Sequence, residues 1–448
     1  MKEIPIKQYL IRGGAWAFAG RVLTAFMGFI LFALLTRLLS PEDMGVYFLA
    51  FNLATFFSIF ASFGLENTLL RFVAEAIGCG EFTKANSTIK KILFLAFLSS
   101  TATILLYFTA SSLVFQYFFT SNALGEIKEY IAIWLLLLTF QKIFSEVFRA
   151  AQDIRMAIFT GGLFTSIASV FFLTLYLLTK KNHTTLPEVL LWILSAGILN
   201  IVFSCWGLSL KIRWLPDTAP RKKKDIDGVG YGILVAHSWP LFINAIMTFF
   251  LSQSSIWVVG TFCSAHDLAI YGAVSRLVLF TGITLSIVNA IVPPMIAHLN
   301  VQNKKKQLEK VLQTTATLSA LPSLVILSVY LFCDSWILST LFGDFYRTGG
   351  SILIILSIGQ LVNIFVGSCG YTLIMMGYRR TIMFISTFST IIALSISFIL
   401  VKNHGTIGVA IAYTTGMIVQ QLLMLLATRY QCGIWTHASF RALVSFNS

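Results

Sequence analysis

The chain has 448 residues, of which 57% are hydrophobic and only 11% are charged. A soluble domain carries roughly 25% charged residues, so this chain has too little charge to cover a surface that faces water. Its net charge of +14 would suit a nucleic-acid or anionic-lipid partner, but in a membrane protein basic cytoplasmic loops are the plainer cause. The composition therefore predicts a protein that crosses a membrane many times.

The apolar stretches of the chain predict its transmembrane helices, each of which requires about 20 residues. Such stretches use almost the whole chain and leave no room for a soluble catalytic domain. The sequence therefore predicts an all-α integral membrane protein with twelve spans, over residues 13–38, 44–65, 91–115, 128–151, 156–179, 186–211, 236–262, 267–296, 311–333, 350–375, 380–401 and 405–428.

The distribution of basic residues predicts the orientation of these spans. If the N-terminus is cytoplasmic, 23 of the 32 Lys and Arg residues fall in inner loops and termini, and only 6 fall in outer loops. Short cytoplasmic loops carry such an excess of positive charge. We therefore expect a multi-pass protein of the cell inner membrane, with both termini in the cytoplasm.

The chain also shows an internal repeat. The segment from Ser40 to Tyr47 (SPEDMGVY) reappears 224 positions later as Ser264 to Tyr271 (SAHDLAIY), and each copy lies between the first and second span of its half. A polar break follows the sixth span. We therefore predict an N-terminal six-helix bundle over residues 1–213, a cytoplasmic linker over 214–228 and a C-terminal six-helix bundle over 229–448, in a parallel repeat about an axis along the membrane normal.

The inner loop after the second span contains one further candidate element. Residues 67–75 can form an amphipathic helix at the membrane surface, with Arg71 and Glu75 paired one turn apart. The alternative is an ordinary surface connection.

Several kinds of chemistry are not supported by any motif. The sequence contains no GxxxxGK[ST] phosphate loop, no HExxH metal motif and no GxSxG nucleophile elbow, and its six cysteines are scattered. We therefore expect no catalytic residues, no metal, no cofactor and no nucleic-acid partner. The sequence predicts that the protein is not an enzyme.

Charged and amide side chains inside the predicted spans are the strongest functional signal, because burying them in a bilayer is costly. Arg21 and Arg276 have no acidic residue within one helical turn, which favours a water-filled cavity that attracts anions. Lys142 and Glu146 either line that cavity or neutralise each other as a packing pair. The candidate substrate-binding cations are Arg21, Arg276 and Lys142, with polar support from Glu146, Asn52, Asn244 and Gln253.

The chain resembles a known family in several places. The first block runs from Arg37 to Tyr47 (RLLSPEDMGVY) and is followed by Gly64 to Glu66 and by Arg71 to Glu75. Later blocks are LFGD from Leu341, GYTL from Gly370 with Met376-Gly377, and Gly405 with GVAIA from Gly408. With these blocks the chain is similar to the oligosaccharide–lipid flippases of polysaccharide biosynthesis, of the O-antigen type, in the MOP exporter superfamily.

The resemblance implies a MATE-like fold, with two six-helix bundles around a central cavity. It also implies transport of an isoprenoid pyrophosphate-linked oligosaccharide from the inner to the outer leaflet by alternating access, for O-antigen, capsule or exopolysaccharide synthesis. In that family cavity cations bind the anionic lipid head, a role that Arg21 matches by its position in the first span. The implied partners are this substrate, membrane lipids and glycan polymerase machinery.

Two other functions remain open at this point. A MATE-like small-molecule exporter would prefer cationic substrates and should have a cavity rich in carboxylates, whereas here the interior cations outnumber the acids. A membrane glycan polymerase or ligase would need a long outer loop with charged catalytic residues, and the sequence has none.

Overall fold

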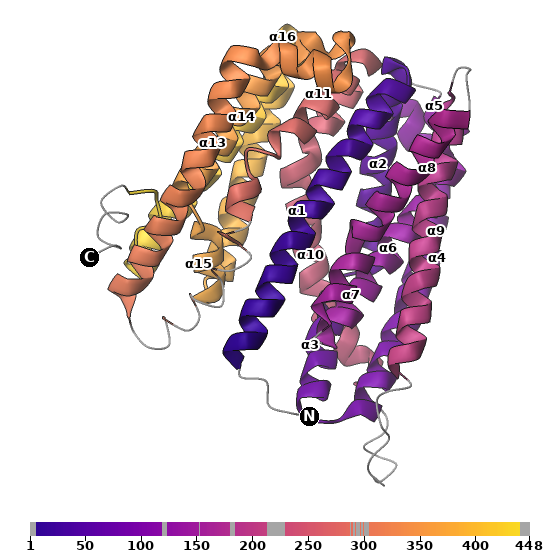
Figure 1. Ribbon diagram of the computed structural model, residues 1–448, viewed down its shortest axis with the longest axis vertical. Coiled ribbons are helices and arrows are strands. Elements are labelled where there is room, and N and C mark those ends of the chain that lie inside the picture. The colour runs from indigo at the N-terminus through magenta and orange to yellow at the C-terminus, as the bar shows by residue number, and fades with distance from the viewer. Residues whose placement is uncertain are drawn as a thin grey trace. The chain divides into compact units, whose positions relative to one another are not determined.

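The computed structural model describes residues 6–118, 123–151, 153–179, 184–212, 229–286 and 304–439, together with positions 288, 289, 292, 296 and 299. These residues are helical almost throughout (Figure 1). The predicted linker over residues 214–228 lies outside the described residues.

The helices of the first half are α1 (Ile6–Leu38), α2 (Pro41–Ser62), α3 (Leu65–Gly78), α4 (Phe82–Phe118), α5 (Ala123–Glu126), α6 (Lys128–Ala150), α7 (Ile154–Ile158), a π-helical turn (Phe159–Leu163), α8 (Phe164–Thr179) and α9 (Leu186–Ile212).

The second half is also helical. Its elements are α10 (Tyr231–Phe262), α11 (Ala265–Val278), α13 (Lys305–Phe342), a 3₁₀ turn (Asp344–Gly349), α14 (Gly350–Val366), α15 (Cys369–Met375) and α16 (Arg379–Cys432).

Among the described residues, ten helices are long and apolar enough to cross a membrane. The all-α membrane architecture is therefore confirmed, whereas the count of twelve is not. One difference lies in α16, which contains two of the predicted spans and breaks at Gly405, where φ is +52° and ψ is −135°. The two arms run antiparallel, since Gln420 donates a hydrogen bond to Ser386 and Gln431 donates one to Thr381.

The other difference lies in the predicted span over residues 267–296. There α11 ends at Val278 and the chain turns through residues 279–282. A helix of 14 residues is about 21 Å long, which is short of the roughly 30 Å of a bilayer core. The structure therefore interrupts this span near its middle.

The chain separates into two compact units. The first comprises residues 1–39 and 46–249, and the second comprises residues 40–45 and 250–448. The N-terminal part of α10 thus packs with the first unit, although the predicted C-terminal bundle begins at residue 229. The division into two bundles of six helices stays a prediction.

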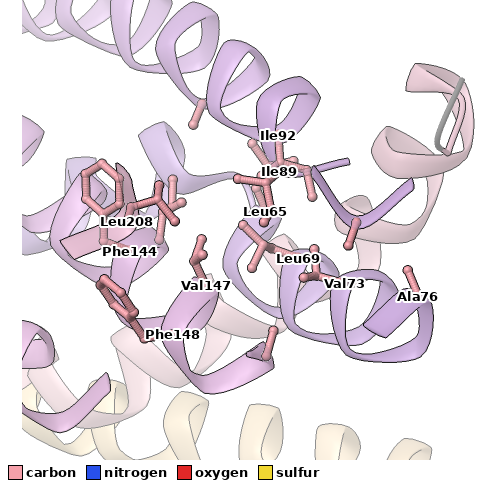
Figure 2. Close-up of a cluster of buried hydrophobic side chains, with 14 of the residues drawn as sticks. Leu65, Leu69, Val73, Ala76, Ile89, Ile92, Phe144, Val147, Phe148 and Leu208 are labelled. Atoms are coloured by element: carbon pink, nitrogen blue, oxygen red, sulfur yellow. The ribbon is translucent and has the colours of Figure 1, made fainter. Parts of the chain in front are cut away.

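The amphipathic helix expected at residues 67–75 is present as α3. Its buried residues Leu65, Leu69, Val73 and Ala76 recur every three or four positions, which places them on one face against α4 and α6 (Figure 2). The expected pairing of Arg71 with Glu75 is wrong, because Arg71 instead lies 2.7 Å from Nε2 of His237 on α10.

The repeated motif forms the same local structure twice, because each copy begins a helix. The Ser40 hydroxyl accepts a hydrogen bond from the backbone N–H of Asp43 at the start of α2, and Ser264 does the same with Asp267 at the start of α11. Each cap satisfies one of the free N–H groups of a helix end, an effect worth about 1 kcal/mol. Helix capping therefore explains why Ser and Asp keep this spacing in both copies.

Candidate functional site

The second unit contains a pocket that brings two of the predicted site residues together. The pocket encloses about 520 Å³, including the solvent at its mouth, and both Arg276 of α11 and Gln253 of α10 line it. Its other polar lining residues are Ser252, Ser255, Tyr271, Ser275, Gln360 and Tyr413. Four helices, α10, α11, α14 and α16, thus contribute polar side chains to one pocket.

The interruption of the eighth span positions Arg276 in this pocket. Arg276 lies in the last turn of α11, so its positive charge is next to the negative end of the helix dipole. The residues that follow are held by main-chain bonds such as Thr281 N–H to the carbonyl of Val278. Inside a bilayer, interrupted helices occur where they are covered by protein or line a cavity. The break is therefore itself typical of a binding site.

The chemistry of the pocket suits an anion that carries hydroxyl groups. One guanidinium provides a forked set of donors that matches phosphate oxygens. The amides and hydroxyls around it can both donate and accept hydrogen bonds. Among the described lining residues none is Asp or Glu. Within the described part of the chain, no three His, Cys, Asp or Glu side chains are grouped as metal ligands either.

Lys142 and Glu146 lie elsewhere, in a charged cluster of the first unit that also contains Ser58, Glu66 and Arg149. Lys142 Nζ donates a hydrogen bond of 3.1 Å to the Ser58 hydroxyl of α2. Glu66, at the start of α3, is the acidic neighbour whose charge acts on Lys142. Glu146 pairs with Arg149 at 2.8 Å. The cluster contains two carboxylates and two cations, and the acidic charge that acts on Lys142 comes from α3.

The other three predicted site residues lie on α1, α2 and α10. Arg21 is exposed on α1, which packs against α7 and α8, and the adjacent Gly20 lies against Ile158 of α7. Asn52 is buried in α2 and Asn244 is exposed on α10. Two pairs of the seven predicted site residues thus lie together within a unit, Arg276 with Gln253 and Lys142 with Glu146.

Sequence reasoning missed most of the pocket lining. Gln360 is recognisable in the sequence as an amide within a span, but Tyr271 and Tyr413 read as ordinary apolar positions. The available signal was the run Leu279-Phe280-Thr281-Gly282, in which a threonine and a glycine follow two large apolar residues. Because its neighbours are apolar, the run looked like the middle of a continuous helix.

The arrangement of helices is that of a known class of membrane transporter. A solved structure titled as the inward-facing conformation of a multidrug resistance MATE family transporter of the MOP superfamily matches with a TM-score of 0.72 at 16% identity, over 92% of this chain and 94% of that one. The lipid II flippase MurJ, in an inward closed conformation, matches with a TM-score of 0.67 at 17% identity, over 94% and 87% of the two chains. The protein has the MOP transporter fold.

The family follows from the sequence comparison. The model of the family described as "Polysaccharide biosynthesis protein" matches residues 10–300, and the MatE model matches residues 240–399. The chain belongs to the polysaccharide biosynthesis protein family, as the sequence blocks suggested. It is also 23% identical over 431 residues to the probable low-salt glycan biosynthesis flippase of Haloferax volcanii, which covers 92% of this chain and 82% of the relative.

Proposed function

We propose that the protein is a flippase that carries an isoprenoid pyrophosphate-linked oligosaccharide from the inner to the outer leaflet of the cytoplasmic membrane, for synthesis of a surface polysaccharide. Family membership and the flippase names of the archaeal relative and of MurJ support this proposal. The observation that carries it is the pocket around Arg276, in which one cation stands among amides and hydroxyls.

In this proposal Arg276 binds the pyrophosphate and Gln253 binds a neighbouring oxygen, with Gln360 and the pocket hydroxyls facing the first sugar. Arg21 is a second capture point for the anionic head. Lys142, Glu146 and Asn52 support helix packing in the first unit, and Asn244 is a polar position on the substrate path. The lipid tail stays in the bilayer, and transport proceeds by alternating access of two six-helix bundles joined by the linker over residues 214–228.

The proposal also includes the orientation of the protein in the membrane, the driving force for transport and the fate of the substrate. Both termini are placed in the cytoplasm, because the basic residues follow the positive-inside rule. Outward movement of a negative charge is favoured by an inside-negative potential, by about 2.3 kcal/mol per charge for each 100 mV. The flippase delivers its substrate to glycan polymerase machinery on the outer side and performs no covalent chemistry itself.

A multidrug exporter is the second candidate, because the MatE model and the MATE structure both match. The same pocket argues against it. A cationic drug requires an anionic or aromatic site, and an arginine in the pocket would repel the ligand.

Deleting the gene tests the proposal. We expect lipid-linked oligosaccharide to accumulate on the inner leaflet and surface polysaccharide to fall, with both effects reversed by the wild-type gene. Normal surface polysaccharide in a deletion strain that has no second flippase would refute the proposal, and resistance to cationic drugs that depends on the gene would favour the exporter.

A further inference from the structure

The last described residues of the chain, Gly433–Ser439, turn back into the second unit after α16. We call them the C-terminal segment. They are not helical, and Ile434 and Thr436 within them are fully buried. Ser439 reaches Thr317, which lies 12 residues after the start of α13 at Lys305. Those residues correspond to about 18 Å of helix, so the segment re-enters the bundle deeply.

Hydrogen bonds hold the segment against α13 and the end of α14. Thr317 Oγ1 accepts a bond of 2.9 Å from the backbone N–H of Ser439, and its single proton is shared between the carbonyl of Gln313 at 2.7 Å and that of Ser439 at 3.2 Å. The N–H of Ala438 donates to the carbonyl of Phe365 at 2.7 Å, and the Thr436 hydroxyl donates to that of Val366 at 2.9 Å. These two carbonyls belong to the last turn of α14, where no helical N–H is left to bind them.

The C-terminal segment packs closely against the backbone just after α14. Gly367, which follows α14, has φ of +77°, and a Cβ there would lie 2.7 Å from the carbonyl oxygen of Thr436. A glycine is therefore required both by the backbone conformation and by the approach of the C-terminal segment.

The tip of the segment lies one helical turn from the pocket of Arg276. Gln360 and Leu279 line the pocket, and a Cβ on Gly282 would lie 3.4 Å from the Gln360 side-chain oxygen. Ile364, one turn beyond Gln360 on α14, and Leu285, six residues beyond Leu279, belong to the small buried cluster against which Ala438 packs. The segment thus packs beyond Gln360 on the side where α14 ends, which the basic residues predict to be cytoplasmic.

We infer that the C-terminal segment is a movable inner plug, which closes the Arg276 pocket from the cytoplasm and withdraws to admit the substrate head. Its polar anchors are two hydroxyls and two helix-end carbonyls, groups that water or lipid headgroups can satisfy once it leaves. Withdrawal would uncover Ile364 and Leu285, and with them a route to Gln360.

Thiol labelling tests the plug without measuring transport. In a background in which all six native cysteines are replaced, Gln360→Cys is exposed in inside-out vesicles to a charged, membrane-impermeant methanethiosulfonate reagent. We expect labelling at least 10-fold faster in a chain that ends at Gly433 than in the full chain. Lys306→Cys, on the exposed start of α13, should label equally in both chains.

A point variant covers the case in which the shortened chain does not fold. Thr317→Val removes the hydroxyl that binds both backbone groups of Ser439, and it should speed labelling of Gln360→Cys several-fold. The matched control is Thr314→Val, whose hydroxyl bonds the carbonyl of Lys310 in its own helix. Equal labelling in the Thr317→Val and Thr314→Val chains would overturn the inference.

A cross-link tests whether the plug must move, and this part rests on the proposed function. Thr317→Cys with Ser439→Cys should form a disulfide that lowers flipping of lipid-linked oligosaccharide at least 5-fold until a reductant is added. The control pair, Thr284→Cys with Ser323→Cys, joins hydroxyls 3.0 Å apart in the same region and should not change the rate. Unchanged flipping in the oxidised Thr317–Ser439 form would overturn the plug and leave the flippase intact. Faster labelling in chains that flip nothing would support the plug and reject the flippase.

Discussion

Glu42 and His266 occupy the same position in the two copies of the repeated motif, and they contact each other. Oε1 of Glu42 lies 2.9 Å from Nε2 of His266, and the side chains are 224 residues apart in the sequence. Both are about half exposed, so the pair itself adds little stability. The first turn of α2 therefore meets the first turn of α11 through equivalent parts of the repeat.

This contact depends on Gly45, which lies against the carbonyl of Ala265 with no space for a Cβ. We expect Gly45→Ala to destabilise the protein by about 1–3 kcal/mol, because the backbone of α11 would have to move. The measurement is the melting temperature and abundance of the detergent-solubilised protein. Gly28→Ala is the control, since nothing lies within 4 Å of a Cβ there. Equal stability of the two variants would show that the contact is loose.

Arg276→Gln should reduce complementation of a flippase deletion about 10- to 100-fold, because the loss of a charge-assisted hydrogen bond costs roughly 1.5–3 kcal/mol. Arg276→Lys should restore part of the activity, since it keeps the charge and loses the forked donor set. Surface polysaccharide is measured at matched protein abundance. Arg347→Gln, on the exposed 3₁₀ turn before α14, should behave as wild type. Wild-type complementation by Arg276→Gln would exclude the anion-binding role.

Arg21→Gln should also reduce complementation, with partial recovery in Arg21→Lys, if the exposed face of α1 contacts the anionic head. An arginine that only reaches the membrane surface would tolerate glutamine without loss of function. Because Arg21 is exposed, neither variant should change the melting temperature. A loss of activity accompanied by a loss of protein would count against a role in substrate binding.

Lys142→Met should destabilise the protein, because it leaves Glu66 and Glu146 with one cation between them. Adding Glu66→Gln should recover much of the loss, with a coupling energy of about 0.5–3 kcal/mol in a double-mutant cycle. Thermal unfolding of the wild type, the two single variants and the double variant measures this coupling energy. If the double variant is stable but cannot complement, Lys142 binds substrate as first predicted from the sequence.

Reporters fused after Arg213 and after Lys310 should both report the cytoplasm, because both positions follow inner clusters of basic residues. The side of the membrane is measured by comparing two fusions at each position, one to alkaline phosphatase and one to green fluorescent protein. An external signal at either position would reject the predicted topology.

The membrane class and the long helices follow from composition and apolar length, which depend on the local sequence alone. The break at Gly405 follows the polar residues Lys402, Asn403 and His404 and lies between two predicted spans. The break inside the predicted span over residues 267–296 differs. The turn after Val278 lies within an apolar run, and only packing against neighbouring helices decides that the chain turns there. The same holds for the candidate site. Arg276 and Gln253 can be singled out from the sequence as polar residues within apolar spans. That they line one pocket with Tyr413 depends on how α10, α11 and α16 pack. Lys142 shows the limit most clearly, because its acidic neighbour Glu66 comes from another helix.

The burial of the C-terminal segment also affects how the second unit is made. Domains generally fold from the N-terminus during synthesis, and this segment follows all the described helices of the second unit in the chain. Until it is made, the carbonyls of Phe365 and Val366 lack their partners, and the space taken by Ile434 and Thr436 is empty. The core of the second unit therefore closes only after α16 and the segment that follows it have been synthesised.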